Sequence, residues 1–336
     1  MGGDYGPEVT IPAALQALRQ YPNLKLRLVG DEELLTKLLK LNSEAPGERL
    51  FIQHASQEVA MDESPVHALR TKKDSSMRVA INQVKEGKAD ACVSAGNTGA
   101  LMATAKFVLK TLPGIDRPAI ISSFPSRIPG KLVRMLDLGG NVDCTDENLV
   151  QFAMMGSALV SAIDNNERPS VALLNIGEEE IKGNEQVKRT AQLLSNNPFI
   201  NYCGYIEADR IFSGDVNVIV CDGFVGNISL KSMEGMARFI ADSAKGEFKR
   251  TLFSKLVALC TFPVLKRLKE SIDPGRHNGA NFIGLRGIVV KSHGGANVWA
   301  FAQAISEAIK QVEADVPNKI SREMSASLPE EERKSA

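Results

Sequence analysis

Cysteine is scarce in this sequence, and its placement excludes two kinds of cross-linked domain. Five cysteines are spread over 336 residues, no two form a Cys-x-x-Cys pair, and none lies at ligand spacing from a histidine. Zinc sites need such clusters, and disulfide frameworks need paired cysteines. We therefore expect a reduced protein with buried thiols. The four histidines are also far apart, so we expect no metal site.

Long apolar runs are absent as well. No run reaches the roughly 20 residues that a membrane-spanning helix needs, and the first residues do not follow the pattern of a signal peptide. The net charge indicates no partner, because 40 basic residues balance 40 acidic ones. We expect a cytoplasmic protein that associates at most peripherally with the inner face of the cell membrane.

Several catalytic signatures are missing too. The sequence has no Gly-x-Gly-x-x-Gly after a strand, no Gly-x-x-x-x-Gly-Lys-Ser/Thr, no Gly-x-Ser-x-Gly and no His-Glu-x-x-His. These absences argue against a dinucleotide-binding fold, a P-loop enzyme, a serine hydrolase of the elbow type and a zinc protease. Nothing in the sequence indicates a covalent nucleophile.

What the sequence does contain is a regular alternation of strand and helix patterns. Short apolar runs such as 89–93, 133–138 and 171–176 end in glycine turns and are followed by amphipathic segments. This alternation predicts a mostly parallel sheet with helices on both faces, and the length fits two lobes. We place the first α/β lobe at 1–135 plus 280–320 and the second at 136–244.

The turn at residues 94–100 follows a buried strand and opens a strong helix. Such a turn directs unpaired backbone N–H groups and the positive end of the helix dipole at one point, which suits an anion. Similar Gly-Asn turns recur at Gly96-Asn97, Gly140-Asn141, Gly183-Asn184 and Gly226-Asn227. Each pair alone is typical of a plain turn, but together they predict a polar crevice where the carboxyl ends of parallel strands meet.

Two side chains near these turns are candidates for catalysis. Lys182 lies in a glycine-flanked loop after a strand, and His293 lies between a strand and a helix. The alternatives are a solvated surface lysine and a packing histidine. A site with these residues would bind an anion and polarise a carbonyl group.

A basic segment at 245–279 differs from the rest of the chain. Its apolar positions predict two amphipathic helices, with Pro263 ending the first and an apolar tip at 259–263. The hairpin either packs on the body or on a second subunit, or it contacts an anionic membrane or an acidic protein. We expect a mobile tail at 321–336.

Six motifs resemble the bacterial phosphate acyltransferase (PlsX) family, and the similarity runs from the first residue to about Val316. They are Met1-Gly2-Gly3-Asp4, Ser94–Ala100, Leu136–Asn141, Asn175–Glu179, Cys221–Asn227 and Lys291–Gly294. The resemblance implies a two-lobed α/β/α sandwich like phosphotransacetylase and the isocitrate and isopropylmalate dehydrogenases. Family members have a short strand before the first motif, and we expect that strand to be missing here.

The resemblance also implies an activity. The family transfers a fatty acyl group from acyl carrier protein to inorganic phosphate without a metal or an organic cofactor. A membrane glycerol-3-phosphate acyltransferase then uses the acyl phosphate to begin phospholipid synthesis, and the enzyme is expected to be a homodimer. The rival hypotheses are a phosphotransacetylase that uses acyl-CoA, a metal-dependent decarboxylating dehydrogenase of the same fold, and a membrane-associated scaffold.

We assign roles to the matching residues on this basis. Gly96, Asn97, Thr98 and Gly99 would bind phosphate, and Lys182, Asn227 and His293 would be catalytic. Asp4, Asn141, Lys291 and Ser292 would support the cleft. Lys249, Arg250, Leu256, Phe262, Lys266 and Arg267 would contact the carrier protein or the membrane.

Overall fold

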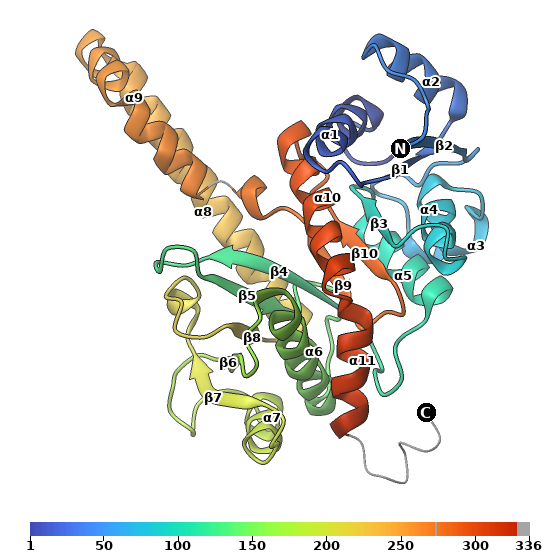
Figure 1. Cartoon of the computed structure of the whole chain (residues 1–336). Coiled ribbons are helices and arrows are strands. Elements are labelled where there is room, and N and C mark those ends of the chain that lie inside the picture. The colour runs from blue at the N-terminus through green and yellow to red at the C-terminus, as the bar shows by residue number, and fades with distance from the viewer. Residues whose placement is uncertain (273, 328–336) are drawn as a thin grey trace.

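The strands form one large and one small sheet. The computed structural model describes residues 1–272 and 274–327, and side chains outside 268–274 (Figure 1). The large sheet has eight strands in the order β3-β10-β9-β4-β5-β8-β6-β7, and the small sheet pairs β1 with β2. The bounds are β1 Leu26–Gly30, β2 Leu50–His54, β3 Ala91–Ser94, β4 Ala119–Pro125, β5 Leu132–Leu136, β6 Ser170–Leu174, β7 Asn201–Ile206, β8 Val218–Val220, β9 Ala280–Ile283 and β10 Ile288–Lys291.

The large sheet contains two blocks of parallel strands that run in opposite directions. β3 and β10 are parallel, and β4 has the same direction because β9 is antiparallel to both β10 and β4. The β4–β5 hairpin then reverses the chain, so β5, β8, β6 and β7 run the other way. The prediction that all four Gly-Asn turns lie at one sheet edge is therefore wrong. The Gly96-Asn97 turn lies at one edge, and the other three follow strands that end at the opposite edge.

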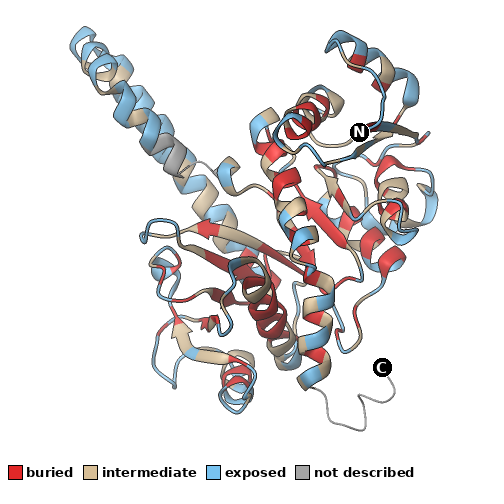
Figure 2. Cartoon of the chain, in the orientation of Figure 1, coloured by how far each residue is buried: buried red, intermediate tan, exposed pale blue. Residues whose placement is uncertain are grey.

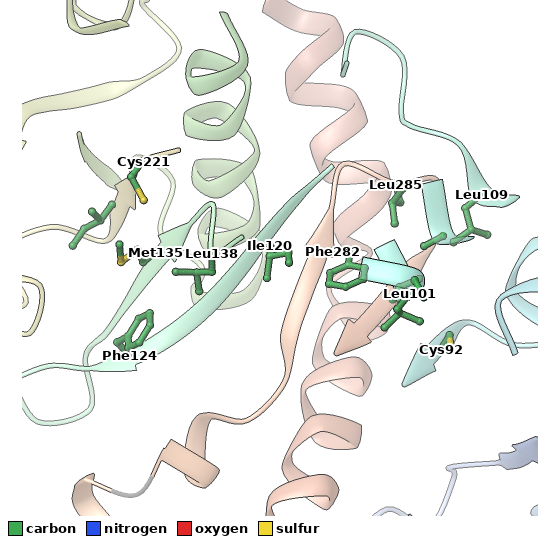
Figure 3. Close-up of a cluster of buried hydrophobic side chains, with 14 of the residues drawn as sticks. Cys92, Leu101, Leu109, Ile120, Phe124, Met135, Leu138, Cys221, Phe282 and Leu285 are labelled. Carbon is green, nitrogen blue, oxygen red and sulfur yellow. The ribbon is translucent and has the colours of Figure 1, made fainter. Parts of the chain in front are cut away.

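Helices cover the first block of strands on both faces. They are α1 Pro7–Gln20, α2 Glu32–Leu41, α3 Pro65–Thr71, α4 Ser76–Lys85, α5 Thr98–Leu109 and α10 Val298–Glu313. Asp31 caps α2, since its side chain accepts a hydrogen bond from the backbone N–H of Leu34. The buried side chains of α5 belong to a cluster that continues across the sheet (Figure 3). That cluster runs from Cys92 and Leu101 through Phe282 to Met135 and Cys221, so one core serves both blocks.

The second block is covered by α6 Asp146–Asp164, α7 Glu185–Ser195 and α11 Val316–Ser327, with a 3-10 turn η1 at Ala208–Arg210. Thr145 and Asn148 form a capping box at the start of α6. The prediction of a mobile tail at 321–336 is wrong for residues 321–327. These residues belong to α11, which packs on α6 and buries Ile320 and Met324. Their spacing of four residues places both on one helix face. Residues 328–336 lie outside the described residues.

The predicted lobes are connected by continuous pairing. The predicted boundary at residues 135/136 falls inside β5, which bonds to β4 on one side and β8 on the other. The division into two lobes therefore remains a prediction, and the large sheet runs without a break through both predicted lobes.

A long helical hairpin projects from the body (Figure 1). It consists of α8 Gly223–Arg250 and α9 Leu252–Ile272, which pack along each other, and it is followed by a 3-10 turn η2 at Pro274–His277. The structure has the predicted protruding hairpin, but the predicted helix break at Pro263 is wrong, because α9 continues through Pro263 and the chain turns at Thr251. A proline within a helix costs about 3 kcal/mol, and packing along α8 offsets this cost. Most of the hairpin surface is exposed (Figure 2).

Candidate active site

The first part of the site is the turn between β3 and α5. Asn97 is the N-cap of α5, and its side-chain oxygen accepts a hydrogen bond from the backbone N–H of Ala100 at 3.0 Å. Its side-chain amide donates to the carbonyls of Met61 and Glu63, each at 2.9 Å. The Asn97 side chain therefore stabilises the loop and connects it to residues 61–63. The N–H groups of Thr98 and Gly99, in the first turn of α5, have no carbonyl partner within the helix, and both residues are exposed.

The N-terminal turn fastens this loop to the end of β10. The backbone N–H of Asp4 donates to the carbonyl of Gly294 at 2.9 Å. Gly3 has a φ of +84°, and a Cβ atom added there would lie 2.9 Å from the Cβ of Ala95. Only glycine fits this close approach without strain. Asp4, which the sequence places in the site, therefore sits beside Gly294 and the turn at Ala95.

Lys291 is buried beneath the same turn. It is 8% exposed, and its Nζ donates to the carbonyls of Ala95, at 3.3 Å, and Ser292. Burial lowers the Lys291 pKa to about 8, Asp4 opposes this shift, and the nearby charge of Lys231 adds to it. A cation with a lowered pKa therefore contacts the turn that directly precedes α5.

His293 and Ser292 are held by one asparagine. The side chain of Asn278 donates to Ser292 Oγ at 2.7 Å and accepts from the backbone N–H of His293 at 2.9 Å. His293 is exposed, and its Nδ1 accepts a hydrogen bond from the N–H of Gly295 at 3.1 Å. Because Nδ1 accepts this hydrogen bond, the ring proton is assigned to Nε2, which is left as the N–H donor.

The second part of the site is built around a buried carboxylate. Asp137, which has no exposed surface, accepts hydrogen bonds from the N–H groups of Ile120, Gly140 and Asn141 and from the Asn141 side chain. Burial raises the pKa of Asp137, and these hydrogen bonds oppose the shift. Asn141 also donates to the carbonyl of Pro118 at 2.8 Å, so its side chain supports the turn.

Asn227 lies against this turn. Its Cβ is 3.3 Å from the position that a Cβ on Gly139 would occupy. The sequence predicts a helix from residue 228, but α8 begins at Gly223 with Asp222 as its N-cap, so Asn227 lies inside the helix. Within the part of the chain that the structure describes, the Asn227 amide makes no hydrogen bond and is exposed, so it is free to bind a ligand.

Helices α5 and α8 connect the two parts. Met102, one turn into α5, lies 3.1 Å from the position of a Cβ added to Gly140. On α8, Lys231 is one turn beyond Asn227, and its charge acts on Lys291. The first turn of α5, the end of β10 and the start of α8 therefore surround one region, although the two strand blocks end at opposite sheet edges.

Lys182 lies in the loop after β6, on the side of the second block. β6 pairs directly with β8, so this loop and Asn227 follow neighbouring strands that end at the same edge. The described contacts of Lys182 are with its own loop: its N–H donates to Glu179 O, and its carbonyl accepts from Asn175. The structure brings Lys182 to the side of Asn227, and no contact joins it to Lys291 or His293.

Three residues of this site escaped the sequence analysis. Asp137 had a signal, because it is an acidic residue directly after a buried strand. Asn278 and Lys231 had none, since each depends on contacts between distant segments. No group of three or more His, Cys, Asp or Glu side chains suited to a metal ion occurs among the described residues.

The hairpin residues predicted to contact a carrier or membrane are exposed along its length. Lys249 and Arg250 directly precede the turn at Thr251, and Leu256 and Phe262 are 59% and 61% exposed. Lys266 and Arg267 lie about 20 Å from the turn at Thr251, because an α-helix rises about 1.5 Å per residue. No helix in the described ranges combines the length and apolarity needed to cross a bilayer.

Comparison with known proteins identifies the family. The family model described as "Fatty acid synthesis protein" matches residues 1–319. Phosphate acyltransferase from Coxiella burnetii is 57% identical over 335 residues, covering 99% of this chain and 97% of that protein. Phosphate acyltransferase from Methylococcus capsulatus is 58% identical over 324 residues, covering 96% and 95%.

A solved structure supports the fold. A phosphotransacetylase from Streptococcus pyogenes superposes with a TM-score of 0.60 at 19% identity, covering 92% of this chain and 91% of that one. The predicted α/β fold and the resemblance drawn from the six motifs are both confirmed. The chain belongs to the fatty acid synthesis protein family, and its relatives identify it as an acyltransferase.

Proposed function

We propose that the chain transfers a fatty acyl group from the thioester of acyl carrier protein to orthophosphate and releases an acyl phosphate. The observation that carries this proposal is the exposed first turn of α5, which follows directly on the turn at Ala95 whose carbonyl accepts a hydrogen bond from the buried Lys291. A helix N-terminus with an adjacent cation suits a phosphate ion. The names of the relatives and the description of the family support the choice of phosphate and of a fatty acyl group.

In this mechanism the protein positions reactants that need no covalent catalyst. A phosphate oxygen attacks the carbonyl carbon of the thioester, the C–O bond forms, and the C–S bond breaks. The proton of hydrogen phosphate leaves with the thiolate, which becomes the free thiol of the carrier. Thr98 and Gly99 would hold the phosphate, and the Nε2–H of His293 would orient one of its oxygens. Asn227 and Lys182 would stabilise the negative charge that develops on the carbonyl oxygen.

The experiment that tests this function is a phosphate-dependent thiol-release assay without added metal. Fatty acyl carrier protein and the matching acyl-CoA are compared as donors at equal concentration. We expect thiol release to require phosphate and to be faster with the carrier-bound donor. A preference for short acyl-CoA would instead assign a phosphotransacetylase activity, and no phosphate dependence with either donor would leave only a scaffold.

The pH dependence of turnover is expected to depend on Lys291. Its folded pKa, about 8, is below its ordinary value of 10.5, so the ammonium charge is lost as pH rises through about 8. Turnover should therefore fall above that pH in the native enzyme. The Lys291→Met variant should be slower at pH 7 and should show no such fall. A native profile that stays flat from pH 7 to 9 would contradict this role.

The lowered pKa of Lys291 should make the folded chain more stable at the pH values at which turnover falls. Because the unfolded chain binds the Lys291 proton more tightly than the folded one, stability rises with pH between about 8 and 10.5. Denaturant unfolding at a series of pH values should show the free energy of unfolding rising over this range. The rise should be absent in Lys291→Met, which has no titrating group at this position.

The hairpin is proposed to bring the enzyme to its partners. Acyl carrier protein is acidic, and the acyl phosphate has to reach a membrane glycerol-3-phosphate acyltransferase. The exposed basic side chains at Lys249, Arg250 and Arg267, with the apolar Leu256 and Phe262 between them, would contact the carrier, anionic lipid or a second subunit. We accordingly propose a homodimer at the cytoplasmic face of the membrane.

Substitution on the apolar side of α9 separates these possibilities. Leu256→Glu combined with Phe262→Glu should lower co-sedimentation with anionic liposomes at least about tenfold, because burying two charges in a bilayer costs about 2–3 kcal/mol each. The control is Leu41→Glu, a leucine on α2 that is also exposed, at 72%. Unchanged co-sedimentation of the double variant would remove lipid from the proposal.

A further inference from the structure

Three loops at one edge of the large sheet carry exposed apolar side chains. They follow β5, β6 and β8, which are parallel neighbours in the order β5-β8-β6 and therefore end at the same edge. Ile176 and Ile181 are each 80% exposed, and Val142, Phe224 and Ile228 are more than half exposed. We call these five residues the apolar rim. Apolar side chains that gather on one exposed surface mark a place where a ligand or a partner binds.

Hydrogen bonds join the three loops, so the rim is one surface. The N–H of Gly223, in the first turn of α8, donates to the carbonyl of Asn141 at 2.8 Å. The side chain of Gln186, in the first turn of α7, donates to the carbonyl of Cys144 at 2.6 Å. Val142 lies between these two contacts in the chain. It therefore connects the start of α8 to the loop that leads from β6 into α7.

The loop after β6 is closed, so that its two isoleucines lie close together. The side chain of Asn175 donates to the carbonyl of Lys182 at 3.3 Å, which brings the two ends of the loop together. Gly183 permits this return, since its φ is +93° and a Cβ there would lie 2.4 Å from Asn175 Oδ1. Ile176 follows Asn175, and Ile181 precedes Lys182. Both isoleucines are therefore at the neck of the loop.

The rim adjoins the two polar side chains that are proposed to polarise the thioester carbonyl. Ile181 directly precedes Lys182, and Ile228 directly follows Asn227. Phe224, Asn227 and Ile228 also share one face of α8, because they are three and four residues apart. An acyl chain is bonded to the carbonyl carbon. The chain of a donor whose carbonyl oxygen is held by these two residues therefore begins at the rim.

The charges around the rim favour a neutral occupant. Residues 139–144 and 175–183, the loops after β5 and β6, carry four acidic side chains and one basic one, Lys182. The acidic residues are all exposed: Asp143, Glu178, Glu179 and Glu180. Arg210 pairs with Glu178, and the surface is still negative. Such a surface repels anionic lipid and an acidic protein, whereas a hydrocarbon chain carries no charge.

We propose that the apolar rim binds the acyl chain of the donor and thereby determines the preference of the enzyme for chain length. This inference rests on the proposed transfer of an acyl group to phosphate, with the carbonyl held at Asn227 and Lys182. The chain lies across Val142, Ile176 and Phe224 and is partly open to solvent. On such an open surface kcat/KM rises gradually with each added methylene group, by at most about fourfold, the value for full burial.

The test compares a long with a short acyl donor in the phosphate-dependent thiol-release assay. The native enzyme and the double variant Ile176→Ser with Ile181→Ser receive tetradecanoyl and butanoyl donors on the same carrier, and kcat/KM is measured for each. The ratio of the long-chain to the short-chain value should fall at least about tenfold in the variant, as expected when two methylene groups lose burial worth about fourfold each. A loss of activity common to both donors cancels in this ratio.

A second double variant, Val142→Ser with Phe224→Ser, tests the other two loops and should lower the same ratio at least about tenfold. The control is Phe199→Ser, which removes another apolar side chain that is more than half exposed. Phe199 precedes β7, which is parallel to β6, so it lies at the opposite edge of the sheet. Its ratio should stay within about twofold of the native one. Because all these side chains are exposed, every variant should melt cooperatively near the native temperature.

A ratio close to the native one in both double variants would overturn the proposal. An unchanged ratio with a smaller number of subunits in sedimentation velocity would assign the rim to a contact between copies of the chain. An unchanged ratio with weaker co-sedimentation on anionic liposomes would assign it to lipid. Failure of the proposed function gives a different result, because then neither donor supports phosphate-dependent thiol release in the native enzyme.

Discussion

Lys182→Ala is expected to lower turnover by ~10²–10³, the usual cost of removing one donor to a developing oxyanion. The loop presents this ammonium group without neutralising it. Of the three glutamates that precede Lys182, Glu178 pairs with Arg210. Lys182 itself forms no ion pair in the part of the chain that the structure describes. Its charge is therefore available to a substrate on the side of Asn227.

The measurement is steady-state acyl phosphate formation with saturating phosphate and acyl donor, so that the change is read in kcat. The matched control is Lys188→Ala, which removes an equal charge one turn into α7, where Lys188 pairs with Glu185 at 3.7 Å. The control should stay within about twofold of the native rate, because exposed ion pairs contribute little. A Lys182→Ala enzyme with near-native kcat would remove Lys182 from the mechanism.

Asp137→Ala is expected to lower the free energy of unfolding by more than about 3 kcal/mol, since it leaves three backbone N–H groups without an acceptor, at about 1–3 kcal/mol each. Those groups belong to Ile120, Gly140 and Asn141. The Asp137 backbone is equally constrained, because a Cβ added to Gly226 would overlap its carbonyl oxygen. The turn that supports Asn227 thus depends on Asp137.

Urea unfolding followed by circular dichroism gives this number directly. Asp137→Asn retains one carbonyl oxygen as acceptor. Its free energy of unfolding should therefore lie between that of the native protein and that of Asp137→Ala. The control is Asp242→Ala on the exposed surface of α8, which should change stability by less than about 0.5 kcal/mol. A change below about 1 kcal/mol in Asp137→Ala would contradict the structural role of this carboxylate.

Most of the helices and strands could be predicted from the sequence, because their positions depend on residues that are close together in the chain. Short apolar runs ending in glycine turns identified most of the strands, amphipathic patterns identified most of the helices, and Asp31 and Thr145 are typical helix-capping residues. Asn97 was predicted to bind phosphate through its backbone N–H, and that role remains a prediction, but the structural part played by its side chain was not foreseen. Its side chain is consumed by bonds to Ala100, Met61 and Glu63, which only the folded chain brings together.

The errors came from long-range features. The reversal at the β4–β5 hairpin, which separates the Gly-Asn turns between two sheet edges, depends on strand pairing and leaves no local signal. Pro263 signals a helix end, but packing along α8 keeps α9 continuous. Lys291 was expected to support the site; its burial and lowered pKa depend on Ala95 and Lys231, which are distant in sequence.

The central claim is that phosphate binds at the first turn of α5 as the attacking group, and Thr98→Val tests it most directly. This change keeps the shape of the side chain and removes its hydroxyl. Loss of one hydrogen bond to a charged ligand costs about 1.5–3 kcal/mol, so the KM for phosphate should rise by ~10–100-fold while the KM for the acyl donor stays within about twofold. Thr36→Val on α2 is the control and should leave both constants unchanged. A native KM for phosphate in Thr98→Val would contradict the placement of phosphate at this helix.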